Sequence, residues 1–161
     1  MLGRRPVTDG LVEVRLVGLP LELWQHTQEH VDGLLREFAL IVQDEEARAA
    51  TPGRLLALVQ ELNAGYGELS AEQRLEMEAA LARGEAAIDV TYYLPTAAAG
   101  AAQALGHMLD EADEYCRSGD HLLTLATPPE ALRFRRWFLA EFVDQLGGAP
   151  PIPWPQYAGN P

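Results

Sequence analysis

Two histidines one helical turn apart, His26 and His30, come closest to a recognisable chemistry in this chain. With Glu29 they form the pattern H-x-x-E-H, in which two imidazoles bind a zinc ion and the carboxylate activates a water molecule. A zinc-dependent hydrolase that uses these three residues is therefore one hypothesis for the function. A catalytic zinc also needs a third protein ligand from a distant segment and a walled cavity.

The periodicity around the two histidines argues against that site. At about 100° per residue, one face of the predicted helix at 21–42 collects apolar side chains, among them Trp24 and Phe38. His26 and His30 fall on the opposite side, so we expect both imidazoles to face solvent. The interpretation we favour is a solvated histidine face without a cofactor, and adventitious metal binding is an alternative.

Three arginines beside two aromatic side chains form a second group of candidate residues in the segment 129–146. Arg135 projects among apolar positions of the predicted helix, where a guanidinium needs a carboxylate, an aromatic ring or a partner surface. Burial against an internal acid is one interpretation. An interaction surface is the other, because arginine and tryptophan are enriched at protein–protein contacts. The candidate contact residues are Arg133, Arg135, Arg136, Trp137 and Trp154.

The charge balance limits the partners. The chain has 24 acidic and 12 basic residues and a formal net charge of −12. A field of that sign repels phosphate backbones and anionic lipids, so we expect neither nucleic acid nor a membrane as a partner. All 12 basic residues are arginine, which rules out chemistries that require lysine, such as a phosphate-binding loop or a Schiff base. The single cysteine, Cys116, excludes an internal disulfide.

Length and composition predict one domain inside the cell. The 161 residues, 48% of them hydrophobic and 22% charged, suit a single globular domain. No apolar run approaches the roughly 20 residues that span a bilayer, and no signal-peptide segment follows the N-terminus. We therefore expect a cytoplasmic protein with a flexible N-terminus at 1–10, one domain at 11–146 and a proline-rich C-terminal arm at 147–161. Arginine in place of lysine, with abundant alanine, is typical of a GC-rich bacterial genome.

Three segments share one local plan, which is a short apolar strand, then proline or Thr-Pro, then an amphipathic helix. The strands are predicted at 11–18, 87–94 and 122–126, the helices after them at 21–42, 96–118 and 129–146, and two further helices at 54–62 and 71–83. Thr127 and Glu130 have the spacing of a capping box. Right-handed crossovers would place the helices mainly on one face. The predicted fold is therefore α+β or α/β, with a sheet of three strands or slightly more and about five helices.

Residues 147–161 are rich in proline, which interrupts helices and central strands because it lacks a backbone donor. We therefore expect this arm to be extended. Trp154 is the large apolar side chain within it, and we expect this ring to dock the arm on the body of the protein.

Strand–proline–helix openings in the ranges 16–40 and 125–146, above all at 129–138, carry a family resemblance. In these parts, about a third of the chain, the sequence resembles bacterial anti-sigma factors and related partner-switching regulators. That family is a histidine-kinase-type ATPase, marked by an acidic residue and an asparagine on one helix and by glycine-rich lid segments. Here the nearest match, Glu61-Leu62-Asn63, has the wrong spacing and no D-x-G-x-G follows it. The resemblance therefore implies a scaffold without evident ATP chemistry and assigns no site residues.

These features favour a non-enzymatic module that binds a protein partner in a bacterial cytoplasmic signalling pathway, with a homodimer as a further alternative. The zinc-dependent hydrolase with His26, Glu29 and His30 is the second hypothesis. The third is a small-molecule-binding domain whose pocket lies between the sheet and the helices and is lined by Tyr92, Tyr93 and Trp137.

Overall fold

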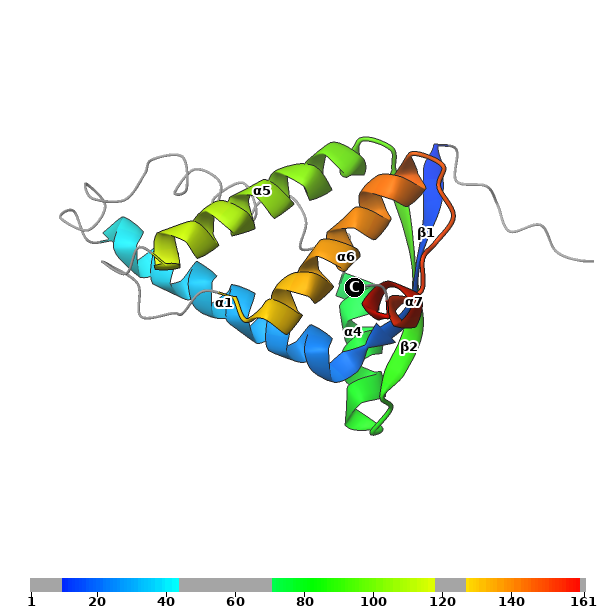
Figure 1. Cartoon of the computed structure of the whole chain (residues 1–161), viewed down its shortest axis with the longest axis horizontal. Helices are drawn as coiled ribbons and strands as arrows, with labels where there is room; N and C mark the ends of the chain where they lie inside the picture. Colours follow the sequence, from blue (N-terminus) through cyan, green and yellow to red (C-terminus); the bar gives the residue numbers. More distant parts are fainter. Residues whose placement is uncertain (1–9, 44–70, 118–126, 160–161) are drawn as a thin grey trace, which may run out of the picture.

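A two-stranded sheet stands at one side of the protein, and the long helices extend from one of its faces (Figure 1). The computed structural model describes residues 10–43, 71–117 and 127–159. Within these ranges the elements follow in the order β1 (Leu11–Pro20), α1 (Leu21–Gln43), α4 (Ala71–Ala82), β2 (Ala87–Pro95), α5 (Ala98–Arg117), α6 (Pro129–Leu146) and α7 (Trp154–Ala158). The predicted mixture of helices and sheet is confirmed.

The sheet has one buried and one exposed face, because side chains alternate along a strand. β1 and β2 are antiparallel, with Val14 opposite Tyr92 in the core-facing row. The pairing shifts between Leu16 and Leu19, at Gly18, whose φ is +68°. This irregularity returns Leu19, which is fully buried, to the core face.

The sheet differs from the prediction. The described residues form two strands rather than three, and the predicted third strand at 122–126 lies outside them, as does the predicted helix at 54–62. The crossover rule behind the prediction applies to parallel strands, whereas β1 and β2 are antiparallel. The helices nevertheless pack mainly on one face, because the buried apolar side chains of the alternating strands, such as Val14, Val90 and Tyr92, lie on that face.

Helix α6 contacts the sheet and two other helices, since it packs against β1, α1 and α5. Phe134, Trp137 and Phe142 carry its aromatic rings into the core. Tyr92 of β2 meets Phe142 edge-on, with ring centroids 4.9 Å apart. Trp24 of α1 is buried in the same core, as its helical position predicts. No helix in the described ranges has the length and apolarity to cross a bilayer.

Glutamine side chains cover both edges of the sheet at the same level. Arg15 and Thr91 are opposite each other in the register, so their outward backbone groups lie on the two edges. Gln145 accepts a hydrogen bond from the Arg15 N–H and donates one to the Arg15 carbonyl, both at 2.8 Å. Gln73 donates to the Thr91 carbonyl at 3.1 Å. These amides occupy backbone groups that would otherwise be open to pairing with another strand.

The proline-rich arm is not wholly extended, because α7 forms within it. Pro153 immediately precedes this helix and Pro155 lies in its first turn. Proline is tolerated there because the first N–H groups of a helix have no intrahelical partner to lose. Trp154 docks the arm on the body, as expected, with its ring 5.8 Å from Phe134 and 5.4 Å from Trp137 between centroids.

Candidate functional site

A buried group of polar side chains joins α1, α5 and α6, and we call it the Arg135 cluster. Its members are His30, Asp110, Asp113, Thr127 and Arg135. Arg135 is 4% exposed. Its guanidinium donates to Asp110 Oδ1 and Asp113 Oδ2, each at 2.8 Å, and to Thr127 Oγ1 at 3.1 Å. The sequence leaves two interpretations open for Arg135, and this geometry supports the first, which is burial against internal acids.

Asp113 is 2% exposed and has donors on both carboxylate oxygens. Besides Arg135, it accepts from the Thr127 backbone at 3.0 Å and from the Thr127 hydroxyl at 2.6 Å. Burial by itself would raise the pKa of Asp113, but the hydrogen bonds from Thr127 and the Arg135 charge outweigh it and lower that pKa. The carboxylate is therefore ionised at neutral pH.

Thr127 does not cap α6, so the predicted capping box with Glu130 is wrong. In a capping box the Thr127 hydroxyl oxygen would accept a hydrogen bond from a backbone N–H of the helix. Here it accepts one from Arg135, and the hydroxyl donates a hydrogen bond to Asp113. Both are charge-assisted hydrogen bonds, which are stronger than a neutral cap.

His30 corrects the expectation that both imidazoles face solvent. Its side chain is 14% exposed, and its Nε2 lies 4.0 Å from Asp113 Oδ1. That nitrogen is buried and has no hydrogen-bond partner among the residues that the structure describes. The reason is that α6 covers a second side of α1, so the buried surface of α1 is wider than one apolar stripe. Burial lowers the pKa of His30 more than the nearby Asp113 raises it, which favours the neutral imidazole.

The residues of the zinc hypothesis do not converge. His26 and Glu29 are exposed, whereas His30 points to the interior beside Asp113. Across the described ranges, no three His, Cys, Asp or Glu side chains are grouped so as to hold a metal ion. The H-x-x-E-H spacing is thus a local feature of α1 that the described part of the fold does not complete.

A second buried polar group, the Glu141 cluster, consists of Glu141 and Gln145 with the backbone of Ile152. Glu141 Oε2 accepts from the Gln145 amide at 2.7 Å and from the Ile152 N–H at 3.0 Å. Burial raises the pKa of Glu141; these hydrogen bonds act against that change, and the nearby Asp144 adds to it. The Trp137 indole donates to the Ile152 carbonyl at 2.8 Å. Side chains of α6 thus hold both backbone groups of Ile152.

Of the five candidate contact residues, Arg136 alone is exposed. Trp137 is 1% exposed in the core. Arg133 donates to the Tyr157 carbonyl at 3.2 Å and lies over the Tyr157 ring, 5.8 Å from its centroid. Arg135 is buried and Trp154 is half-buried against the core, so the surface expected around Arg135 and Trp137 is occupied by the protein itself.

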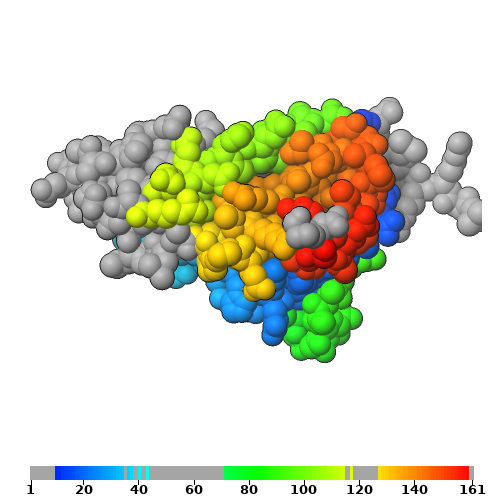
Figure 2. All heavy atoms as spheres, viewed as in Figure 1, coloured from blue at the N-terminus to red at the C-terminus, as the bar shows by residue number. Residues whose placement is uncertain are grey.

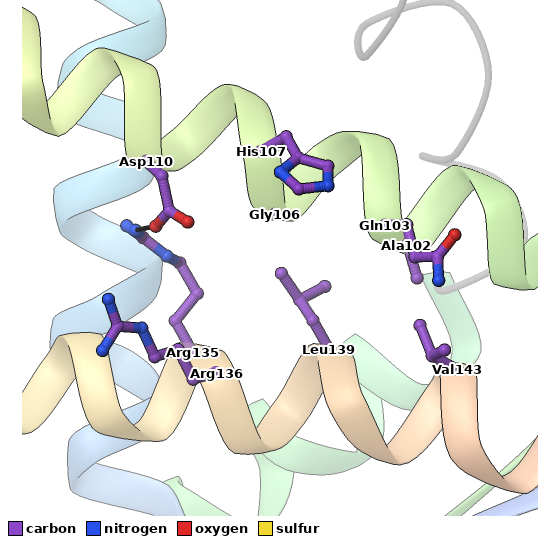
Figure 3. A pocket seen from close by; sticks show the side chains of 9 residues that line it. All are labelled: Ala102, Gln103, Gly106, His107, Asp110, Arg135, Arg136, Leu139 and Val143. Atoms are coloured by element: carbon purple, nitrogen blue, oxygen red, sulfur yellow. Dashed lines mark hydrogen bonds and ion pairs between the residues drawn. The ribbon is translucent and has the colours of Figure 1, made fainter.

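A groove of about 220 Å³ lies between α5 and α6 (Figure 3). Its apolar lining includes Gly106, Leu139 and Val143, and its polar lining includes His107, Asp110 and Arg136. A Cβ added at Gly106 would stand 3.5 Å from Leu139 Cδ1, an ordinary van der Waals contact. Asp110 is 53% exposed and reaches from the Arg135 cluster to the groove surface.

The pocket proposed for a small molecule is not assembled by its three named residues. Tyr92 is buried in the core, whereas Tyr93 is exposed on the opposite face of β2. Neighbouring strand residues point to opposite faces, so Tyr92 and Tyr93 cannot line one cavity. Trp137 packs against Trp154.

Sequence reasoning missed the acids that partner Arg135. Asp110 and Asp113 are three residues apart, and Asp113 borders the apolar stripe of α5 that holds Leu109 and Ala112. An acid beside an apolar stripe and an arginine within another are the signal that could have paired them. No family model, curated protein or solved structure matches the chain. The groove and the two buried clusters are therefore the features from which a function can be inferred.

Proposed function

We propose that the protein is a non-enzymatic module that binds a protein partner in a bacterial cytoplasmic signalling pathway, and that the groove between α5 and α6 is its contact surface. The observation that carries this proposal is the combination of an apolar lining with exposed polar groups in one groove. Leu139 and Val143 can receive an apolar side chain, and Arg136 can pair with a carboxylate or carbonyl beside it. The sequence pointed to the side of α6 that carries Arg135 and Trp137, which is buried. The surface proposed here lies on the outward side of the same helix.

The size of the groove favours a protein partner over a metabolite. Pockets for small molecules usually enclose roughly 300–1,000 Å³ and bury most of the ligand. This groove holds about 220 Å³ and is partly open to solvent. It can accept one or two side chains of a larger surface, which is how apolar anchors act in protein–protein interfaces.

The polar groups at the groove differ in how firmly they are placed. Asp110 is held by its 2.8 Å hydrogen bond from Arg135, so one carboxylate oxygen is committed to the interior. Arg136 forms no ion pair within the described ranges and projects from the next position of α6. In a chain with net charge −12, this arginine is a local positive group that a partner carboxylate can select. The resemblance to partner-switching regulators supports the signalling setting.

Site-specific photocrosslinking tests this proposal. A photoreactive residue at His107, on the groove, should capture one protein from a native bacterial lysate, whereas the same group at Arg83, beyond the end of α4, should not. The captured protein, purified, should form a complex of fixed stoichiometry with the full chain. Arg136→Glu should weaken that complex at least tenfold, which is about 1.4 kcal/mol.

Arg83→Glu is the matched control, because Arg83 is an exposed arginine far from the groove along the chain. It should leave the affinity unchanged. Equal affinity of the wild type and the Arg136→Glu variant for the captured protein would contradict the proposed surface. Recovery of the chain alone would contradict the proposed function.

A further inference from the structure

The proline-rich arm, residues 147–159 of the described chain, packs on a surface formed by α6 and β1. The backbone of Ile152 is held by Trp137 and Glu141, and the Trp154 ring lies against Phe134. Figure 2 shows the arm, in red and orange, lying along the face of the molecule beside α6. These contacts are of the kind that a separate proline-rich peptide could make with the same surface.

The receiving surface is shaped for this segment on the β1 side as well. A Cβ added at Gly18 would stand 2.9 Å from Pro155 Cδ, closer than real Cβ contacts allow. Gly18 therefore permits a close approach of the arm that a larger residue would prevent. The end of the arm is held too, because Arg133 donates to the Tyr157 carbonyl.

The arm returns to its own body through a turn at one glycine. Gly148 has φ of +97°. Its N–H donates to the Gln145 carbonyl at 3.0 Å, and the Ala149 N–H donates to the Asp144 carbonyl at 2.9 Å, the pattern of a Schellman motif. A Cβ at Gly148 would meet nothing within 4 Å, so the requirement for glycine is conformational and not steric.

We propose that the arm is exchangeable between two copies of this chain. When Gly148 leaves its left-handed conformation, residues 150–158 of one copy occupy the surface on α6 and β1 of a second copy, and the exchange is reciprocal. The occupant is a second copy because its arm has the sequence already seen seated on this surface. Every arm–body contact is the same in the closed monomer and in the exchanged dimer.

The balance between the two forms therefore depends on the turn and on charge. In the monomer the attached arm has a high effective concentration at its own site, which favours the closed form in dilute solution. Two bodies of net charge −12 repel each other, so added salt should favour the dimer by screening that repulsion. This inference is independent of the groove between α5 and α6.

Gly148→Val tests the proposal by straining the turn without touching the arm contacts. Valine is disfavoured at positive φ, so the closed monomer is penalised while the exchanged contacts stay intact. Sedimentation equilibrium of the full chain should show a dimer dissociation constant at least tenfold lower than that of the wild type. Gly84→Val is the matched control, because Gly84 has φ of +78° and open space around its Cβ but leads to no arm. It should sediment as the wild type does.

Two further measurements separate arm exchange from other association. The double variant Gly148→Val/Trp154→Ala should return to monomer, because it removes the ring that holds the arm in either copy. A synthetic peptide of residues 149–161 should compete with the exchanged arm and dissociate the Gly148→Val dimer. A dimer that survives either treatment overturns the proposal.

A Gly148→Val chain that stays monomeric with an unchanged tryptophan emission spectrum overturns it as well. Deletion of Ala149 is the second variant, in case Gly148→Val fails to fold. It shortens the connection so that the arm cannot reach its own site with the same contacts, and it should dimerise for the same reason. A folded, monomeric deletion variant would count against exchange as directly as a monomeric Gly148→Val.

Discussion

Helix α6 takes part in two buried polar clusters, and their buried carboxylates, Asp113 and Glu141, have pKa values shifted in opposite directions. Asp113, facing Arg135, meets a full positive charge and two donors from Thr127, and its pKa is lowered. Glu141 meets only neutral donors, from Gln145 and the Ile152 backbone, and its pKa is raised. Burial opposes ionisation in both places, so the charge and number of the donors decide the direction.

The two clusters also hold different parts of the molecule together. The Arg135 cluster ties α5 to α6 through groups that are ionised in the folded protein, and the neutral imidazole of His30 places α1 beside them. In the Glu141 cluster, Glu141 ties the arm to α6 through the Ile152 N–H. Gln145 of the same cluster ties β1 to α6 through hydrogen bonds with the Arg15 backbone. We therefore expect the first cluster to depend on charge and the second on hydrogen-bond geometry.

The largest expected effect is that of Asp113→Asn. The substitution keeps the shape of the side chain but leaves the buried Arg135 guanidinium with only the half-exposed Asp110 as a charged partner, and we expect a loss of about 3–5 kcal/mol in the free energy of unfolding. Urea denaturation followed by circular dichroism measures it. Asp110→Asn is the control: Asp110 is half exposed, and its loss should cost below about 1 kcal/mol. Equal losses would mean that burial does not distinguish the two acids.

Thr127→Val should cost about 1–3 kcal/mol, because it removes a donor to a buried carboxylate. The backbone N–H of residue 127 still reaches Asp113, which limits the loss. The same urea titration measures it. Thr96→Val, at an exposed position before α5, should stay within about 0.5 kcal/mol of the wild type. A Thr127→Val chain as stable as the wild type would show that the hydroxyl adds nothing to what the Arg135 charge and the residue 127 N–H contribute at Asp113.

His30 should make the stability depend on pH. Because its pKa is lowered in the folded state, the unfolded chain binds more protons below the ordinary histidine value of 6.5. The contribution of this group to stability is therefore present above that value and declines as the pH falls, by at most about 1.4 kcal/mol per pH unit for one proton. The difference in urea midpoint between pH 7.5 and 5.5 should shrink in His30→Leu and persist in His26→Leu.

Glu141→Gln should have the smallest effect, within about 1 kcal/mol, because a neutral amide oxygen can accept both hydrogen bonds and no charge is buried. Since the folded pKa of Glu141 is raised, the wild type should lose stability as the pH rises through the range above the ordinary carboxyl value of 4.5. The Gln variant should lack that dependence in urea titrations. A loss as large as that of Asp113→Asn would erase the distinction between the clusters.

The secondary structure of the described chain was largely predictable, because its signals are local. The helix predicted at 129–146 coincides with α6, and the one predicted at 21–42 ends one residue short of α1. Proline positions and apolar periodicity lie within a few residues of the boundaries they set. The arm is the exception: proline excludes a long helix there but permits the short α7.

The candidate site was predictable only in part. A buried arginine calls for an acid, yet nothing in the spacing of the chain selects Asp110 and Asp113, which lie 25 and 22 residues before Arg135. The exposure of Arg136, one position further on, follows once α6 is known to face inward at Arg135. The groove beside Arg136 depends on how α5 packs against α6 near Gly106, and no local sequence pattern predicts that packing.

The amino-acid sequence by itself determined the described elements other than α7, the buried side of Trp24, the absence of lysine chemistry and the acidic character of the chain. Only the tertiary structure decided that His30 is enclosed, that Thr127 serves Asp113 instead of the helix end, and that the arm seats on α6 and β1. The physical reason is the distance along the chain over which each effect acts. Periodicity and proline act on neighbouring residues, whereas burial and pairing depend on which helix faces meet after the chain has folded.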